Sequence, residues 1–363
     1  MDPPRTIIIG ISGCSSSGKT TLARLLRDMF PETFILHEDD FYKPESELPI
    51  NQGHADWDCP EAISIPDLEA ALAHVRATGT FPVSSRVPSA ISPNNTLSRR
   101  SNHGCAPLTS PVPLSPPSPA ILTPAPNTTI RHKDNKSRLP NKPAPRLPSA
   151  QPNVNSIEDL NTVGPCPATP EQIAACAARV KTWLTPGHPG SSIFPSSSSS
   201  SSSNNTPKTR ICILDGFLLY SPPPSSTTTT DTTTATPLRK VMTHLDIKLF
   251  LRATRAAALR RRTARDGYVH MDGFWTDPPG YVEQVVWPNY VAAHSWLFEG
   301  GDVEGGRVDK GVLGGEGILV PESAEGGVDV EFGRVLEWAV GVVMGELERL
   351  CLGEGEGGKE KGE

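Results

Sequence analysis

The chain has 363 residues, a formal net charge of −6 at pH 7, 38 prolines and seven cysteines. The acidic balance offers no general attraction to nucleic acid or to an anionic membrane, so we expect neither as a partner. The cysteines are scattered without a CxxC pair, which disfavours a zinc site or a disulfide framework. Apolar runs are too short for a membrane span or a secretory signal. We therefore expect an intracellular protein, most simply a cytoplasmic one, with the nucleus left open.

Residues 1–80 have the pattern of a folded α/β region. The stretch RTIIIGIS from Arg5 is apolar and β-branched, as in a strand that is buried on both faces. KTTLARLLRDMF from Lys19 spaces its apolar residues as one helical face, and Pro31 stops it. TFILHEDDF predicts a second strand that ends in carboxylates. IPDLEAALAHVRATG predicts a helix that ends at Gly79.

Residues 81–205 are rich in proline, serine, asparagine and threonine. Such a segment buries too little apolar surface to offset its ordering entropy, so we expect a mostly disordered insertion. Within it, TPEQIAACAARVKTWL predicts a helix at 169–184 that packs on the folded part. The basic cluster RHKDNKSR from Arg131 is interpreted as a solvated tail rather than a nucleic-acid site.

Folded character returns over residues 206–352. TRICILDGFLLY and LDIKLFLRA predict strands, separated by a Pro/Ser/Thr-rich loop at 222–236 that we expect to be disordered. An arginine-rich helix, a Gly/Pro-rich lid and a helical stretch with a junction at Pro288 follow. GILVP predicts a last strand, and VEFGRVLEWAVGVVMGELERL predicts a closing helix before a disordered tail at 353–363. The alternation predicts an α/β fold with a mostly parallel sheet and helices on both faces.

The stretch GCSSSGKT fits the phosphate-binding pattern G-x-x-x-x-G-K-[ST] at every fixed position. It lies between a predicted strand and a predicted helix, where backbone N–H groups and the helix dipole hold phosphates. Lys19 is expected to reach the β- and γ-phosphates of ATP, and the Thr20 hydroxyl to ligate Mg²⁺. The residues assigned to nucleotide binding in this loop are Gly13, Cys14, Ser15, Ser16, Ser17, Gly18, Lys19, Thr20 and Thr21.

Carboxylates follow two of the predicted strands. Asp39 and Asp40 come after the second strand, at the sheet edge where ligands bind in such folds. A carboxylate there can accept a proton from an attacking hydroxyl or hold Mg²⁺. Asp215 ends a later strand, as a second carboxylate on the metal side would. A helix cap or a strand-to-turn Asp-Gly would explain the same residues without a site.

Arginines and a tryptophan complete the candidate site. Arg261, Arg262 and Arg265 are placed on one helix, and guanidinium groups there would stabilise charge on a transferring phosphoryl group. Trp57 beside Asp58 suits a flat ring that carries a hydroxylated sugar. A solvated basic face and a core tryptophan are the plain alternatives.

Taken together, these stretches resemble the nicotinamide riboside kinases, within the uridine kinase-like group of P-loop kinases. The matching stretches are IIIGISGCSSSGKTTLARLL, HEDDFYKPESELP, DWDCPEAI, ILDGFLLY, LRRRTAR and PPGYVEQVVWPNY. They sample most of residues 5–78 and 209–297, and DDFYKPE and GYVEQVVWPNY are more specific than the phosphate loop. The segment before ICILDG is far longer than in compact members, and Asp215 stands where a glutamate is frequent. The resemblance implies a kinase domain in two parts, 1–80 and 206–352.

The resemblance implies transfer of the ATP γ-phosphate to the ribose 5′-hydroxyl of nicotinamide riboside, and commonly of nicotinic acid riboside, to supply NAD⁺ synthesis. By position, Asp39 and Lys19 are the catalytic residues, and Thr20 and Asp39 are the metal ligands. Arg261 and Arg265 match nucleotide contacts. The residues that match the substrate site are Asp39, Asp40, Phe41, Tyr42, Trp57, Asp58, Asp215 and Arg262.

Two other functions stay open. A uridine or cytidine kinase-like enzyme would share this chemistry and differ in its base pocket, although Trp57 and DDFYKPE favour nicotinamide riboside. A catalytically silent, nucleotide-binding regulatory protein would act through the low-complexity segments. The intact Lys19, Thr20 and Asp39 argue against that second alternative.

Overall fold

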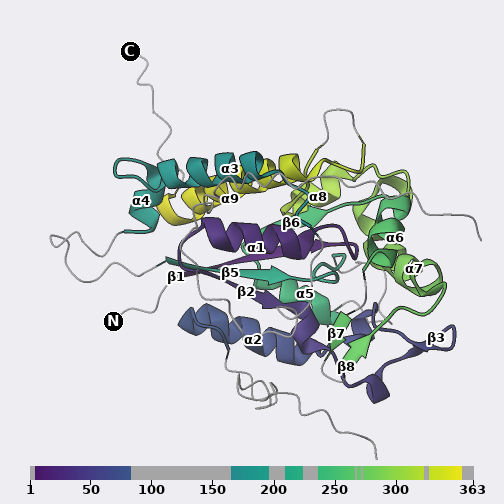
Figure 1. Cartoon of the computed structure of the whole chain (residues 1–363). Helices are drawn as coiled ribbons and strands as arrows, with labels where there is room; N and C mark the ends of the chain where they lie inside the picture. Colours follow the sequence, from purple (N-terminus) through teal and green to yellow (C-terminus); the bar gives the residue numbers. More distant parts are fainter. Residues whose placement is uncertain are drawn as a thin grey trace, which may run out of the picture. The chain divides into compact units, whose positions relative to one another are not determined.

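The main sheet is built from five strands: β1 (Arg5–Gly13), β2 (Thr33–His37), β5 (Thr209–Asp215), β6 (Ile247–Leu251) and β9 (Ile318–Leu319) (Figure 1). They lie in the order β2-β5-β1-β6-β9, and every neighbouring pair is parallel. The α/β fold with a parallel sheet that the alternating pattern predicts is therefore confirmed. Because the strands are parallel, their carboxyl ends all lie at one edge of the sheet, which is where ligands bind in open α/β sheets.

This computed structural model describes residues 5–82, 165–195, 209–223, 236–265, 268–270, 273–322 and 327–353. These ranges all belong to one compact unit of the chain. Most of the predicted insertion at 81–205, most of the loop at 222–236 and most of the tail at 353–363 lie outside the described residues, as does the basic cluster from Arg131. The boundaries assigned to those segments stay predictions.

Helices connect and cover the strands. The α-helices are α1 (Lys19–Met29), α2 (Ile65–Thr78), α3 (Pro170–Trp183), α4 (Pro189–Ile193), α5 (Thr236–Thr243), α6 (Arg255–Thr263), α7 (Trp287–His294), α8 (Lys310–Glu316) and α9 (Phe332–Leu352). The short helical turns are η1 (Glu38–Phe41), η2 (Glu45–Glu47), η3 (Pro60–Ala62), the π-helix η5 (Val282–Val286), η6 (Ser295–Leu297) and η7 (Glu299–Gly301). Two hairpins pair β3 (Ile50–Asn51) with β4 (His54–Ala55) and β7 (Tyr268–His270) with β8 (Gly273–Trp275).

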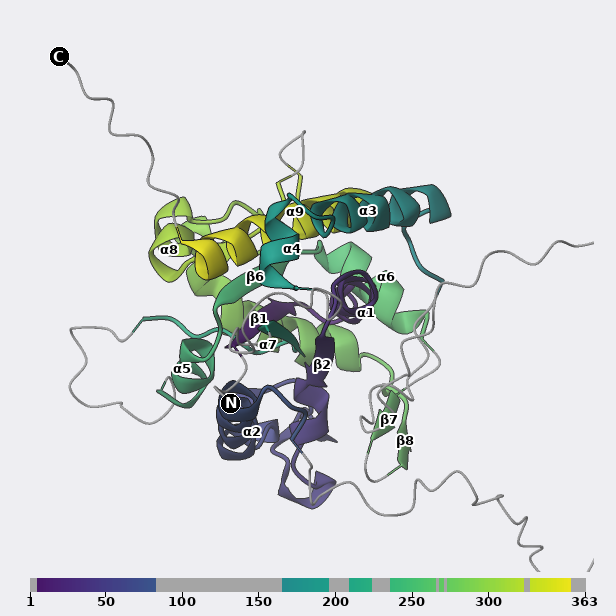
Figure 2. The ribbon, with the colours of Figure 1, turned by 90° about the vertical axis from the view of Figure 1, so that its left-hand side faces the viewer.

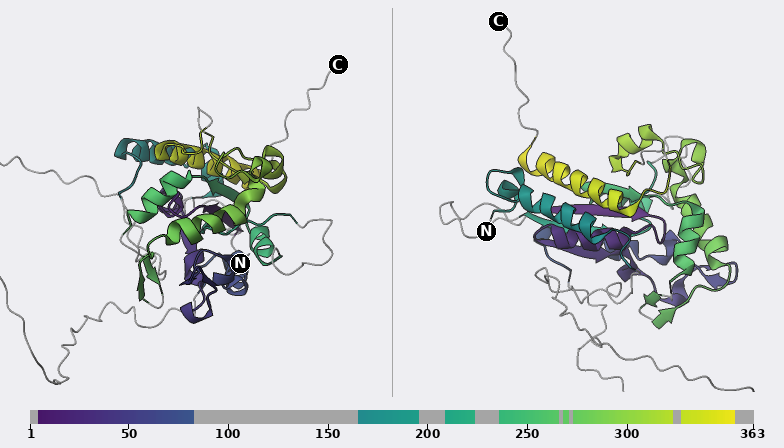
Figure 3. Two further views of the ribbon diagram at one scale, coloured as in Figure 1. Left: turned by 90° about the vertical axis from the view of Figure 1, so that its right-hand side faces the viewer. Right: turned by 45° about the horizontal axis from the view of Figure 1, so that its top comes forward.

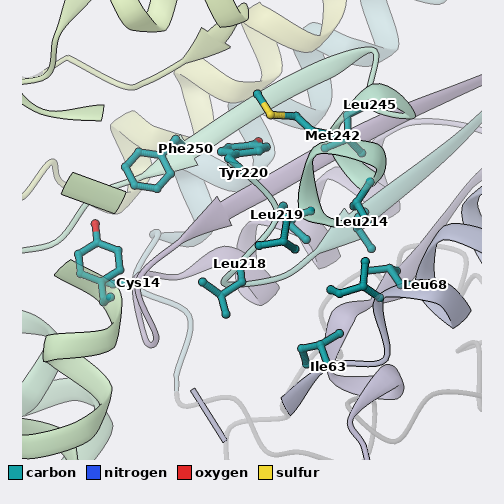
Figure 4. Close-up of a cluster of buried hydrophobic side chains, with 14 of the residues drawn as sticks. Cys14, Ile63, Leu68, Leu214, Leu218, Leu219, Tyr220, Met242, Leu245 and Phe250 are labelled. Atoms are coloured by element: carbon teal, nitrogen blue, oxygen red, sulfur yellow. The ribbon is translucent and has the colours of Figure 1, made fainter. Parts of the chain in front are cut away.

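The sheet separates two hydrophobic cores, because neighbouring residues of β1 point to opposite faces. Ile9 joins the core beneath α1, α3 and α9, whereas Ile8 joins the core beneath α2 and α5. Figure 2 shows α3 and α9 on one side of the sheet and α2 on the other. Figure 4 shows part of the second core, where Leu68 of α2, Leu214 of β5 and Met242 of α5 gather. The expected helical cover on both faces is present.

Local signals place most helix ends where the sequence predicts them. Gly79 has φ 64° just after α2, a left-handed conformation that suits a glycine cap. The helix expected at 169–184 is present as α3, with a reciprocal cap between Thr169 and Gln172. The prediction that Arg265 shares a helix with Arg261 is wrong, because α6 ends at Thr263 and the chain then turns.

Membrane insertion finds no support in the helices. Within the described ranges, none combines the length and the apolar character needed to cross a bilayer. The 21-residue helix α9 buries one face, with residues such as Leu336 and Val343, against the sheet.

Candidate active site

The loop between β1 and α1 is curled so tightly that two of its positions require glycine. Gly13 has φ 143°, and a Cβ there would lie 2.0 Å from the carbonyl oxygen of Leu251. Gly18 has φ 98°, and its Cβ would lie 2.8 Å from the ring of Phe332. Lys19 is buried, and its Nζ donates to the carbonyl oxygen of Cys14 at 2.9 Å. This is the backbone shape that aims N–H groups at phosphate oxygens.

A cavity of about 420 Å³ opens at the carboxyl ends of the strands, beside this loop. It brings together most of the predicted site residues, namely Ser15, Ser16, Ser17, Gly18, Lys19, Thr20, Thr21, Asp39, Tyr42, Trp57, Asp58, Asp215, Arg261, Arg262 and Arg265. Four predicted residues are absent from its lining: Gly13, Cys14, Asp40 and Phe41. Cys14 is buried under the loop, and burial raises the pKa of its thiol to about 11.

Arg262 is the centre of a buried ion-pair cluster at one end of the cavity. Its Nη1 and Nη2 donate to the two carboxylate oxygens of Asp58 at 2.9 and 3.2 Å. Its Nε and Nη2 donate to Asp277 at 2.7 and 3.0 Å, and its Nη1 also reaches Ser15 Oγ at 3.0 Å. One guanidinium therefore ties the phosphate loop, the loop before η3 and the segment after β8 together. Sequence reasoning missed Asp277.

The two carboxyl groups that share Arg262 respond differently to their surroundings. Burial raises the pKa of Asp58 above its ordinary value, although Arg262 acts in the opposite direction. Burial also acts to raise the pKa of Asp277, but this side chain is more exposed, and its hydrogen bonds with Arg262 hold its pKa below the ordinary value. Because Asp58 accepts hydrogen bonds from Arg262, its carboxyl group has a fixed orientation in the cavity wall.

Aromatic rings form the wall next to that cluster. Trp57 is 5% exposed, and its ring centroid lies 5.2 Å from that of Tyr42 and 5.9 Å from that of Trp275. The backbone N–H of Trp57 donates to the Tyr281 hydroxyl at 3.0 Å, which fixes the position of this segment. Trp57 thus belongs to the core and lines the cavity at once. Trp275 was not predicted, because nothing in the local sequence separates it from other lid residues.

Asp215, at the end of β5, lies under the phosphate loop. It is 4% exposed and pairs with His37 Nδ1 at 3.2 Å. Burial acts to raise the pKa of Asp215. Its pKa is nevertheless below the ordinary value, because of the hydrogen bond and charge of His37, the charge of Lys19 and a hydrogen bond from the Thr20 hydroxyl. Asp215 is therefore a carboxylate at this point of the cavity, next to the hydroxyl of Thr20.

A second buried acid, Glu38, supports the turn that follows β5. Its Oε2 accepts from the backbone N–H groups of Phe217 at 2.7 Å and Leu218 at 3.1 Å. Gly216 fits against it without a side chain, since a Cβ would lie 2.5 Å from Oε2. Burial raises the pKa of Glu38 to about 7. Glu38 holds the backbone from which Asp215 and Phe217 line the cavity, a role that depends on contacts distant in sequence.

The C-terminal part of the chain supplies another section of the cavity lining, which is largely apolar but includes Asp329. Val328, Val330 and Phe332 line it, together with Pro321. Among the described residues between 314 and 324, only Pro321 lines the cavity. Asp329 ties this segment to α6, because its carboxylate accepts from the backbone N–H and the hydroxyl of Thr254 at 3.0 and 2.6 Å.

The oxygen atoms that face the cavity fit a magnesium ion better than a metal held by protein alone. The part of the chain that the structure describes contains no group of three or more His, Cys, Asp or Glu side chains placed to hold a metal. Mg²⁺ commonly takes one or two carboxylates and completes its shell with water and substrate phosphates. Thr20, Asp39 and Asp215 line the same cavity and provide such oxygens.

A parallel sheet, a glycine loop between its first strand and first helix, and a cavity at the carboxyl ends of the strands define a P-loop type α/β protein.

The chain is 27% identical over 344 residues to the nicotinamide riboside kinase of Schizosaccharomyces pombe, and the match covers 95% of this chain and 99% of that protein. It is 24% identical over 307 residues to that of Saccharomyces cerevisiae, 84% of either chain. Human nicotinamide riboside kinase 1 is 42% identical over 69 residues, 19% of this chain and 35% of that protein. No family model matches the chain. By its end-to-end similarity to these proteins, the chain belongs to the nicotinamide riboside kinase family.

Proposed function

We propose that this chain transfers the γ-phosphoryl group of ATP to the ribose 5′-hydroxyl of nicotinamide riboside, and of nicotinic acid riboside, to give mononucleotides for NAD⁺ synthesis. One observation carries the proposal: a single cavity joins a phosphate-binding loop to an aromatic wall and a carboxylate–arginine cluster. The full-length similarity to nicotinamide riboside kinases supports the choice of acceptor.

The donor phosphates lie along the loop from Ser15 to Thr21, where backbone N–H groups and the N-terminus of α1 favour negative charge. Lys19 gives up its contact with the carbonyl of Cys14 and pairs with the β- and γ-phosphates. Arg261 and Arg265, which line the cavity next to Arg262, balance the charge that spreads over the transferring oxygens.

The acceptor lies at the aromatic end. Nicotinamide riboside carries a positively charged pyridinium ring, and the faces of Trp57, Tyr42 and Trp275 attract such a cation when it is desolvated. Uracil and cytosine are neutral and gain less from the same wall. Asp58, oriented by Arg262, accepts hydrogen bonds from the ribose hydroxyls.

Asp39 accepts the proton of the ribose 5′-hydroxyl while the 5′ oxygen forms a bond to the γ-phosphorus. The bond between the γ-phosphorus and the β-phosphate oxygen breaks at the same time, and ADP leaves. It lines the cavity from η1, directly after β2. Thr20 and Asp39 would hold Mg²⁺, which neutralises phosphate charge when it is bound. Asp215 accepts a hydrogen bond from the Thr20 hydroxyl and so keeps the hydroxyl oxygen in place.

The test separates chemistry from binding at Asp39. Asp39→Asn should lower kcat by at least about 100-fold, the usual scale for losing a general base, while the Kd for nicotinamide riboside changes by less than about threefold. Calorimetry gives the Kd and ADP release gives kcat. Asp40→Asn is the matched control, because Asp40 is the adjacent carboxylate and does not line the cavity. A kcat for Asp39→Asn equal to that of the control would refute the assignment.

A further inference from the structure

Two residues in the cavity wall come from the segment that we had assigned to the insertion. Pro165 and Pro167 lie just before α3, and both line the same cavity as the phosphate loop. Both are exposed to solvent, whereas Ala168 after them is 5% exposed and packs in the core beneath α1 and α9. The chain is therefore anchored at Ala168, with the two prolines facing the open side.

Helix α3 is a fixed part of the fold rather than a loosely attached element. It lies beside α9 (Figures 1 and 3). Cys176, Val180 and Trp183 are buried on the face that it turns to α1 and α9. The indole N–H of Trp183 donates to Glu348 of α9 at 2.6 Å, and its ring meets Phe30 edge-on, with centroids 6.1 Å apart. The position of the prolines is consequently set by packing.

The N-terminus of α3 is linked to that of α9. Gln172 accepts from the backbone N–H of Thr169 at 2.9 Å, and its amide reaches Glu331 at 3.4 Å. Glu331 in turn caps α9 by accepting from the backbone N–H groups of Gly333 and Arg334 at 2.8 and 3.0 Å. Gly333 packs directly on Gln172, because a Cβ would lie 2.1 Å from its amide.

This link reaches the phosphate loop through Phe332, whose ring packs over Gly18. The prolines line the same cavity as Val330 and Phe332, and the contact between Gln172 and Glu331 holds together the segments that carry them. If phosphates occupy the loop and the acceptor contacts Trp57 and Arg262, the base of the donor nucleotide is left the largely apolar part of the lining that Val330, Phe332 and the two prolines provide. The compact apolar rings of proline and the flat ring of phenylalanine suit contact with the faces of a purine.

We propose that Pro165 and Pro167 form one wall of the site for the donor base, so that the segment before α3 contributes directly to nucleotide binding. This inference rests on the proposed function, since it uses the direction in which ATP lies across the cavity. It assigns a binding role to residues outside the six short stretches that the sequence analysis matched to the kinase family. Contact with a purine face, rather than with phosphate, is the property that distinguishes these prolines.

The test is calorimetric titration of the double variant Pro165→Ala/Pro167→Ala with the non-hydrolysable analogue AMP-PNP and, separately, with inorganic triphosphate. We expect about fivefold weaker binding of AMP-PNP, the loss that ~40 Å² of apolar contact implies, and unchanged binding of triphosphate. The KM for nicotinamide riboside should not move. Pro170→Ala is the matched control, because Pro170 is exposed, begins α3 and does not line the cavity.

Each outcome separates this inference from the proposed function. Equal AMP-PNP affinity in the double variant and in the Pro170→Ala control would overturn the role of the prolines while leaving the kinase proposal in place. A parallel loss of triphosphate affinity would also overturn it, because the prolines would then act on the phosphate loop. Failure of the unaltered protein to bind AMP-PNP would instead contradict the proposed function.

Discussion

The cluster around Arg262 makes a strong prediction about stability. The side chain is 7% exposed and donates to two carboxylates, so Arg262→Met would leave the buried Asp58 and the half-buried Asp277 without the guanidinium between them. Removing one partner of a buried ion pair costs about 3–5 kcal/mol, because the remaining charge is neither solvated nor paired. For a domain of this size that corresponds to a fall in Tm of roughly 10 °C.

The assay is urea unfolding at pH 7, with Arg261→Met as the matched control. Arg261 is the adjacent arginine on α6 and is exposed, so its replacement should change the free energy of unfolding by no more than about 0.5 kcal/mol. The triple variant with Arg262→Met, Asp58→Asn and Asp277→Asn should recover most of the lost stability, because no uncompensated charge remains. A loss below about 1 kcal/mol for Arg262→Met, or no recovery in the triple variant, would refute this reasoning.

Three further outcomes follow from the site and its supports. Burial raises the pKa of Glu38 to about 7 from 4.5, so the stability that its protonated form contributes is complete below pH 4.5 and is lost as the pH rises through 7. In urea unfolding, the free energy of unfolding of Glu38→Gln should therefore be higher than that of the parent by up to about 3 kcal/mol near pH 8 and equal to it at pH 4.5. Identical dependence of the two free energies on pH would contradict this. Gly13→Ala should lose at least about 2 kcal/mol in the same assay, because its Cβ would overlap the carbonyl oxygen of Leu251, and a neutral effect would mean that the loop relaxes freely. Glu331→Ala and Asp309→Ala each remove a helix cap worth about 1 kcal/mol, but only Glu331→Ala should weaken AMP-PNP binding; equal effects on binding would disprove the link to the donor site.

The features that local sequence determines could be predicted. The strand β1 is recognisable because RTIIIGIS is a continuous apolar, β-branched run. Gly13 and Gly18 could be found from the spacing of the phosphate-binding pattern, although the groups that leave no room for a side chain there, Leu251 and Phe332, are distant in sequence. The helix α3 could be found within a low-complexity segment because its cap and its apolar spacing are local signals.

The features that depend on distant contacts could not be predicted. Asp277 and Glu38 matter through their partners: Asp277 through Arg262, and Glu38 through backbone groups 179 and 180 residues away. Phe332 faces the phosphate loop only because α9 covers the same face of the sheet as α1. The arginine helix was predicted two residues too long, since no glycine or proline stands between Thr263 and Arg265 to signal its end.

The central claim is that the two ends of one cavity hold ATP and a cationic nucleoside. Its most direct test is ADP release from Mg-ATP with nicotinamide riboside, nicotinic acid riboside, uridine and cytidine as acceptors, supported by mass detection of the phosphorylated product. We predict turnover with the two pyridine nucleosides and a kcat/KM at least about 100-fold lower with uridine and cytidine, because Trp57, Tyr42 and Trp275 favour a cationic ring. Turnover with uridine or cytidine alone, or with none of the four, would contradict the account.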